Sequence, residues 1–422
     1  MRSRWTRHLW WCLTFLMTST GLASEPSSRF VLGNGLRVVV SPSPNPVPVT
    51  CVHLGYDLSA LAGSESPYPQ KARLLRVLLE PTPWVGVGLG RRWVEESGGQ
   101  LSFGTDGDVI SLSTEIPSVQ LAMVLWREAE RMRSLVVGAL PTAEVGEWAP
   151  WIQVERRARA HLYGEVSRGR RGTSVITAEE LGEQVRRYFT PNNAALALTG
   201  GVTMRQVRSL VEKYFGDIPR GSPPPPQTTE LPPARGPRRL SLEDNTLSEG
   251  VVWVSWVVPP LEGEHKLAFE VMATVLFDGD GSRLRQRLVR TGQVPWFEAS
   301  WEQGRGLGQL WFLMARGQGD PVEDLTAELA ELATTGPSEL ELARARQILA
   351  ARVYEIQSEP QQLARQLVVS ALQSNDPASE LRDPGRWSTV DAPMVAAAVR
   401  AFLAPSSRNV VDVGPVPARG EP

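Results

Sequence analysis

The chain contains one pattern written twice, and this repeat constrains its fold more than any other feature. Residues 175–202 and 389–416 align at an offset of 214 residues. Each copy reads as a helix that runs into a proline (Pro191 and Pro405), followed by an apolar strand and then a glycine. Proline ends a helix because it has no backbone N–H and its ring clashes with the preceding turn. The repeat therefore predicts two similar structural units.

A proline-rich stretch separates the two copies. Residues 220–239 read RGSPPPPQTTELPPARGPRR, a composition that excludes a helix or a central strand and favours an extended linker. We therefore predict an N-terminal domain over 29–219, a linker over 220–239 and a C-terminal domain over 240–416.

Short alternating or apolar runs and longer amphipathic runs occur in both halves, which indicates an α+β fold. We expect each domain to be a mostly antiparallel sheet with helices packed on one face. The expected strands are 36–40, 47–54, 109–116, 250–258 and 308–316, and the expected helices are 118–136, 265–277, 321–332 and 337–356.

The N-terminus has the pattern of a secretory signal peptide over residues 1–23. Arginines precede a short apolar run, and small residues precede an expected cut near Ala23. Removing this segment leaves Cys51 as the only cysteine, so no intrachain disulfide is expected, and no membrane span remains. We therefore expect a secreted, periplasmic protein. A formal net charge of −2 does not favour nucleic-acid binding.

Several motifs resemble the pitrilysin/insulinase family of metallopeptidases, and most closely its processing-peptidase branch. The most specific is YFTPNNAALALTGGVTMRQVRSLVEKYFGDIPRG, and LGNGLRVVVSP and VLFDGDGSRLRQRLVRTG match other family segments. The resemblance implies two homologous α+β domains that form one half of a clamshell. It also implies a zinc site built on a His-x-x-Glu-His helix, in which two histidines on one face bind zinc and the glutamate acts as a general base.

That motif is degenerate here. The aligned stretch is Arg73-Leu74-Leu75-Arg76-Val77, so both histidines and the glutamate are replaced. Glu155, which lies 78 residues after Val77, matches the third zinc ligand of the family. One carboxylate does not hold zinc, so we expect no metal and no catalytic residue in this chain. Arg73 or Arg76 pairing with Glu155 in place of the metal is one hypothesis, and arginines that reach solvent are the alternative.

The second half departs from the family pattern too. The family's substrate-binding Arg and Tyr correspond to Val289 and Trp296, whereas the Arg of the Ser-Arg-Leu step is kept as Arg283. The resemblance makes Arg283, Trp296 and the adjacent Phe297 candidate contacts for substrate or partner.

The resemblance implies a non-catalytic subunit that binds extended peptides and pairs with a homologue bearing His-x-x-Glu-His, which would hold the only zinc. Family chains of this length close a clamshell in pairs. A stand-alone peptide-binding or scaffold protein is the alternative, and an atypical metallopeptidase is a weaker one because the four histidines of the chain form no His-x-x-x-His pair.

Overall fold

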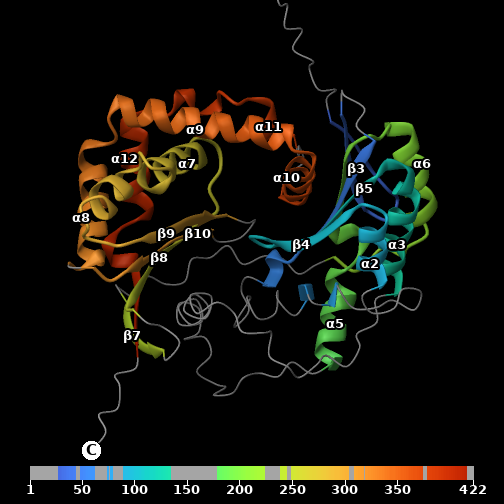
Figure 1. Ribbon diagram of the computed structural model, residues 1–422, viewed down its shortest axis with the longest axis horizontal. Coiled ribbons are helices and arrows are strands. Elements are labelled where there is room, and N and C mark those ends of the chain that lie inside the picture. Colours follow the sequence, from blue (N-terminus) through green and yellow to red (C-terminus); the bar gives the residue numbers. More distant parts are fainter. Residues whose placement is uncertain are drawn as a thin grey trace, which may run out of the picture.

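Two β-sheets with packed helices make up the protein. The computed structural model describes residues 27–43, 48–61, 74–75, 77–78, 89–134, 178–223, 238–244, 249–303, 308–317, 319–373 and 378–415. Figure 1 shows one sheet with its helices on each side of the view. No helix in these ranges is long and apolar enough to cross a membrane.

The first sheet has six strands in the order β1-β2-β6-β3-β5-β4. Strand β6 runs parallel to β2 and antiparallel to β3, and the remaining neighbours are antiparallel. Its strands are β1 (Ser28–Val31), β2 (Arg37–Pro42), β3 (Val49–Asp57), β4 (Gln100–Asp106), β5 (Val109–Pro117) and β6 (Ala194–Gly200).

The second sheet has five strands in the order β7-β11-β8-β10-β9, which repeats the order β2-β6-β3-β5-β4 of the first. Strand β11 is parallel to β7 and antiparallel to β8, just as β6 is parallel to β2 and antiparallel to β3. Its strands are β7 (Arg238–Asp244), β8 (Val251–Val258), β9 (Phe297–Glu302), β10 (Gly308–Ala315) and β11 (Asn409–Pro415).

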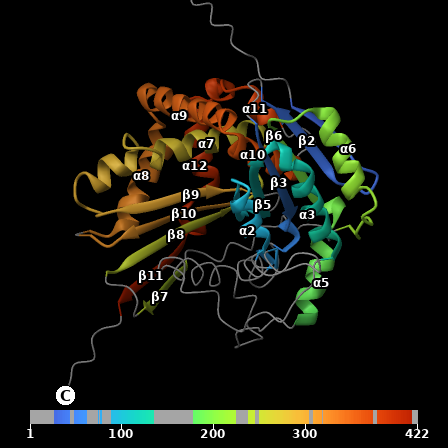
Figure 2. The ribbon, with the colours of Figure 1, turned by 45° about the vertical axis from the view of Figure 1, so that its right-hand side comes forward.

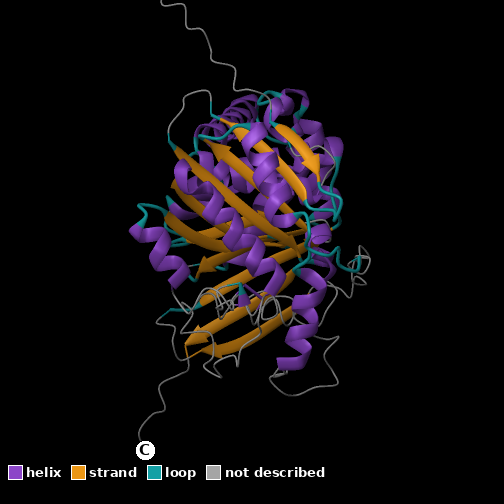
Figure 3. Ribbon diagram, turned by 90° about the vertical axis from the view of Figure 1, so that its right-hand side faces the viewer, coloured by secondary structure: helices purple, strands orange, loops and turns teal. Residues whose placement is uncertain are grey.

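The helices of each unit cover one face of that unit's sheet, and Figure 3 shows those of the first unit in front of its strands. Side chains that alternate along the strands meet these helices in two large apolar clusters. The helices of the first unit are α2 (Leu89–Glu96), α3 (Leu121–Ser134), α5 (Ala178–Tyr188) and α6 (Met204–Phe215). Those that follow β8 are α7 (Gly263–Phe277), α8 (Pro321–Thr335), α9 (Glu339–Ser358), α10 (Pro360–Gln373), α11 (Ser379–Arg382) and α12 (Ala392–Phe402). Short turns of 3₁₀ helix are η1 (Ser59–Leu61), η2 (Ser118–Gln120), η4 (Pro191–Asn193), η6 (Arg386–Thr389) and η7 (Pro405–Ser407), and η5 (Arg285–Val289) is a π-helix.

The structure bears out the α+β fold with two mixed sheets, and the helix, turn and strand of the predicted motif occur in both copies. Helix α5 ends before a 3₁₀ turn that begins at Pro191, and α12 ends before the same turn at Pro405. At the start of α12 the capping residue is Asp391, whose carboxylate accepts a hydrogen bond from the Met394 N–H at 2.9 Å. The domain boundaries stay a prediction, because 224–237 lies outside the described residues.

One helix departs from the expected arrangement. Helix α10 belongs to the second half of the chain but packs on the first sheet, against β3 and β6 (Figures 1 and 2). The first sheet therefore carries helices on both faces, whereas we expected them on one face only. Figure 1 places α10 between the helices of the second unit and the first sheet.

Candidate functional site

The helix that resembles a zinc-binding helix is part of the apolar core. Leu74, Val77 and Leu78 are buried in the cluster that lies between the first sheet and its helices, and Val77 is 0 % exposed. Val77 stands where the family motif has its second histidine. A valine offers no nitrogen, oxygen or sulfur atom to a metal, and its burial in this cluster keeps the position dry.

The other residues of the degenerate motif, Arg73, Arg76 and Glu155, lie outside the described residues, as does the predicted signal peptide over 1–23. The pairing of an arginine with Glu155 therefore remains a hypothesis. Within the described ranges, no three His, Cys, Asp or Glu side chains gather closely enough to hold a metal ion.

A buried group of three charges lies beside this helix. Glu128 on α3 accepts hydrogen bonds from Arg127 (Nε at 3.0 Å and Nη2 at 2.6 Å) and from Arg131 (Nε at 3.1 Å). Arg131 also donates to the carbonyl oxygen of Leu78, the last described residue of the degenerate helix. Arg127 donates to the Thr114 hydroxyl at 2.9 Å. The group therefore ties α3 to that helix and to β5.

Electrostatics fix the charge state of Glu128. Burial by itself would raise the pKa of this carboxyl, but the two arginines outweigh burial and hold the pKa below its ordinary value. Each carboxylate oxygen already accepts a hydrogen bond from a guanidinium, an arrangement that favours a structural ion pair over a general base. Tyr56 lies close by with a buried hydroxyl that has no hydrogen-bond partner in the part of the chain that the structure describes, and burial raises its pKa.

The last strand of the first sheet, β4, offers a different kind of site. It ends the strand order, so one side of its backbone has no neighbouring strand among the described elements. Helix α2 lies along one of its faces, where the Arg91 guanidinium lies 5.8 Å from the ring centre of Phe103. Helix α10 lies along the other face, where Gln361 donates to the Ser102 hydroxyl at 2.9 Å. Phe103 is 42 % exposed.

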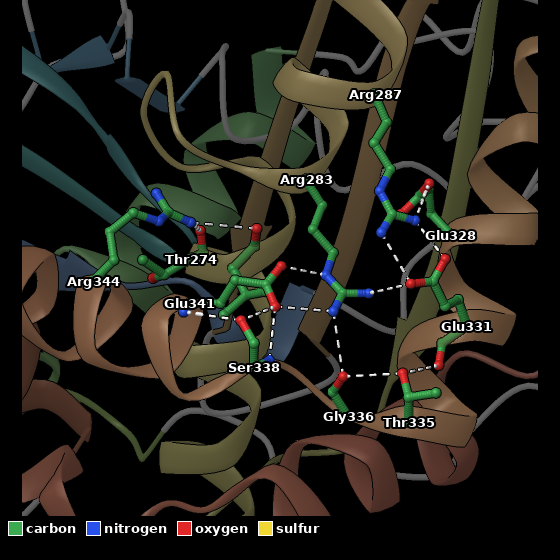
Figure 4. A network of polar contacts seen from close by, with 11 residues as sticks. Thr274, Arg283, Arg287, Glu328, Glu331, Thr335, Gly336, Ser338, Glu341 and Arg344 are labelled. Atoms are coloured by element: carbon green, nitrogen blue, oxygen red, sulfur yellow. Dashed lines mark hydrogen bonds and ion pairs between the residues drawn. The ribbon is translucent and has the colours of Figure 1, made fainter.

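The three candidate contacts in the second half lie in different surroundings. Arg283 is buried and donates to both carboxylate oxygens of Glu341, at 2.6 and 3.0 Å, and to the carbonyl oxygen of Gly336 at 3.2 Å (Figure 4). Glu331 lies 3.7 Å from the same guanidinium. Arg283 thus joins the start of η5 to the end of α8 and the start of α9, and its charge is matched inside the chain.

The pKa of Glu341 reflects this network. Burial acts to raise its pKa, but hydrogen bonds from Arg283 and from the backbone and side chain of Ser338 lower it to about 2. Ser338 and Glu341 also form the capping box that begins α9. The network therefore holds the segment around Arg283 against helices α8 and α9 (Figure 4).

Trp296 and Phe297 lie on opposite faces of the second sheet. Phe297 is buried on the helix-covered face, with the Arg285 guanidinium 5.1 Å from its ring centre. Trp296 is partly exposed on the other face, beside the stacked Trp253 and Trp311, and its indole N–H donates to Glu249 at 2.9 Å. Their roles as substrate or partner contacts stay a prediction.

Two features of these sites were not predicted from the sequence: the charge group on α3 and the packing of α10 on the first sheet. The sequence LWREAERMRS carries a signal for the first, because Arg127, Glu128 and Arg131 are spaced one and three residues apart on one helix face. The pattern resembles an ordinary solvated face, and only the packing shows that it is buried.

Comparison with known proteins agrees with this picture. Residues 176–349 match the family model described as "Peptidase M16 inactive domain", M16 being the insulinase type. A search of curated proteins finds no relative. Among solved structures, a protease from Helicobacter pylori superposes with a TM-score of 0.77 at 18 % identity, over 93 % of this chain and 100 % of that one. An M16 inactive domain from Pseudomonas fluorescens gives 0.71 at 16 %, over 93 % and 98 %.

The first half of the periplasmic protease PqqL from Escherichia coli superposes with a TM-score of 0.65 at 15 % identity, over 93 % of this chain and 92 % of that half. Against the whole of PqqL the TM-score is 0.66 at 14 % identity, and the match covers 48 % of that protein. These comparisons confirm the resemblance to M16-type peptidases: the family model matches residues 176–349, and the solved structures share the fold.

Proposed function

We propose that this M16-like chain is a non-catalytic subunit that binds extended peptides and pairs with a homologue bearing His-x-x-Glu-His. The observation that carries the proposal is Val77, which is fully buried in the apolar core at the position of a zinc-ligating histidine. The peptidase-like fold is retained, but the apolar side chain of Val77 occupies the position that a metal-binding histidine has in the family motif. In this proposal zinc is held by the partner alone.

Strand β4 supports the peptide-binding part of the proposal. An exposed edge strand pairs its free backbone N–H and C=O groups with an added strand, which gives affinity without demanding one sequence. The exposed ring of Phe103 supplies an apolar contact for one side chain of such a strand. Helices α2 and α10 line the two faces of β4 and restrict the approach to its free edge.

The size relationship to PqqL supports the pairing. This chain matches 48 % of that periplasmic protease, which therefore holds about two units of this size in one chain. A second chain that carries the zinc ligands would complete an assembly of the same size around the unit described here. The same neighbour supports a periplasmic location.

A native pull-down from the organism's own envelope fraction tests the pairing. We expect one stoichiometric companion of similar size that carries His-x-x-Glu-His. Metal analysis should then find about one zinc per complex and less than about 0.1 zinc per chain in the isolated protein, because protein zinc sites are held near stoichiometrically. Elution alone, or only with copies of itself, refutes the pairing and leaves the stand-alone peptide-binding protein.

Peptide binding is tested separately with a library of fluorescein-labelled 12-residue peptides. We expect Phe103→Ala to weaken binding about tenfold, which corresponds to about 1.4 kcal/mol for a lost apolar contact. The matched control is Val31→Ala, an exposed residue on β1 at the opposite edge of the same sheet. Equal binding by the two variants contradicts a site at β4.

A further inference from the structure

Helix α10 packs on the first sheet through a surface of small and polar residues. On β3 the alternate positions Cys51, His53 and Gly55 face α10, since a Cβ added to Gly55 would lie 2.5 Å from the Val368 side chain. The strand neighbours of His53 are Ser113 on β5 and Ala197 on β6. This surface is less apolar than the opposite face of the same sheet, which packs against the helices of the first unit and where Leu, Val and aromatic residues dominate.

Polar contacts fasten the rim of this interface. Arg365 on α10 forms an ion pair with Asp106 on β4. The Thr199 hydroxyl donates to the carbonyl oxygen of Pro360 at 2.7 Å, at the first residue of α10. Interfaces of this mixed character between parts of one chain resemble transient protein interfaces, and movement across them is the ordinary expectation.

His53 lies under α10 and is 4 % exposed. Among the residues that the structure describes, neither ring nitrogen of His53 has a hydrogen-bond partner. The charged groups that act on it are Asp106 from β4 and Arg365 from α10, which are already paired with each other. On the same face of the sheet, Glu115 of β5 lies opposite Cys51. Among the described residues, a protonated His53 would thus be a buried cation whose acting carboxylate, Asp106, is already paired with Arg365.

We propose that α10 is an acid-sensitive latch between the two halves of the chain, docked while His53 is neutral and released when His53 is protonated. Release hydrates the imidazolium and separates the second half from the face of the first sheet that includes β3, β5 and β6. Because α10 also lies against β4, release changes one wall of the strand that we propose binds peptides. The latch itself does not depend on that proposed function.

The sign and size of the effect follow from the histidine. Burial lowers the pKa of His53 from 6.5 to about 4, Asp106 acts to raise it and Arg365 to lower it further. Because the pKa of His53 is lower in the docked state than in the released state, His53 stabilises the docked state fully above pH 6.5, and this stabilisation is lost as the pH falls toward 4. At pH 5 the docked-to-released ratio is expected to be about 30-fold lower than at pH 8.

Cys51 is a built-in probe of this release. It is fully buried, it faces α10, and Cys12→Ser in the full chain makes it the only thiol. Its labelling rate with 4,4′-dithiodipyridine, which reacts in acid, is measured from pH 8 to pH 5. Each rate is divided by the rate for the urea-unfolded chain at the same pH, since burial raises the pKa of this thiol to about 11. We expect the normalised rate to rise about 30-fold.

Three variants decide the outcome. His53→Leu and His53→Gln both remove the titrating group, so their normalised labelling rates should stay within about threefold over this pH range. His265→Gln changes an exposed histidine on α7 and should behave as the parent chain does. An unchanged pH dependence in both His53 variants overturns the latch, and so does a parent chain whose labelling does not rise. Loss of far-UV circular dichroism at pH 5 also overturns it, because release would then be global unfolding.

Discussion

Replacing Glu128 by glutamine should destabilise the protein more than any exposed charge change in the same unit. Glu128 is 2 % exposed, and its two arginine partners are also buried. The variant leaves Arg127 and Arg131 facing a neutral amide, so two buried cations lose their counter-ion. Breaking a buried ion pair in this way costs about 3–5 kcal/mol in free energy of unfolding. The penalty arises from the stranded arginines rather than from the lost attraction itself.

Urea denaturation at pH 7 measures this cost. With a slope of about 3 kcal/mol per molar urea, the loss lowers the midpoint by about 1–1.7 M. The matched control is Glu95→Gln on α2, where the ion pair with Arg91 has a length of 3.8 Å and both side chains are about half exposed. Exposed pairs of this kind contribute at most about 0.5 kcal/mol, so the control should hardly move the midpoint.

The pH dependence gives an independent check. The pKa of Glu128 is lowered by folding, so its stabilising contribution is complete above about pH 4.5 and is lost as the pH falls through the folded-state pKa. The difference between the parent chain and Glu128→Gln should therefore shrink below pH 4. A midpoint shift in Glu128→Gln no larger than in Glu95→Gln refutes the reasoning. So does a difference in stability between the parent chain and Glu128→Gln that becomes larger as the pH is lowered below 4.

Three further outcomes follow from the structure. Arg283→Lys keeps a positive charge but loses the bidentate contact with Glu341, and should lower the free energy of unfolding by about 2 kcal/mol, measured by urea denaturation at pH 7. The stabilising contribution of Glu341 is present above pH 4.5 and is lost toward its pKa of about 2, so this cost should become smaller in acid. The exposed Arg290→Lys is the control. Gly55→Ala should destabilise by about 1–3 kcal/mol, since its new methyl group would meet Val368 at 2.5 Å, whereas Gly104→Ala on β4 meets nothing within 4 Å and should lose much less. Asp391→Ala should lower the free energy of unfolding by about 1 kcal/mol through loss of the α12 cap, with the helicity of the chain otherwise kept.

The repeat was predictable because it rests on local rules. A helix that stops at proline and gives way to an apolar strand needs only a few residues to be recognised, and the two copies keep those residues at matching positions. Helices α5 and α12, and the turns after them, lie at the same offset of 214 residues that the sequence shows. Their strands then pair in the same way, parallel to one neighbour and antiparallel to the other.

The position of α10 was not predictable in the same way. Its apolar residues, among them Leu367 and Val368, show that one face is buried but carry no information about which sheet buries it. Chain order favours the nearer sheet, since consecutive elements usually pack together. The decisive features lie far away in sequence, namely the missing side chain of Gly55 and the carboxylate of Asp106. Contacts of this range are fixed by three-dimensional packing rather than by any local pattern.

The loss of zinc ligands did not cost this chain its fold, because the motif helix also has a structural role. Leu74, Val77 and Leu78 all belong to the apolar cluster, and Arg131 binds the backbone of the same helix at Leu78. Burying an apolar side chain of this size contributes about 1.5–3 kcal/mol, so a valine in place of a histidine strengthens the packing as it removes the metal ligand. Apolar packing and this hydrogen bond therefore hold the helix in position with a valine where the family motif has a histidine.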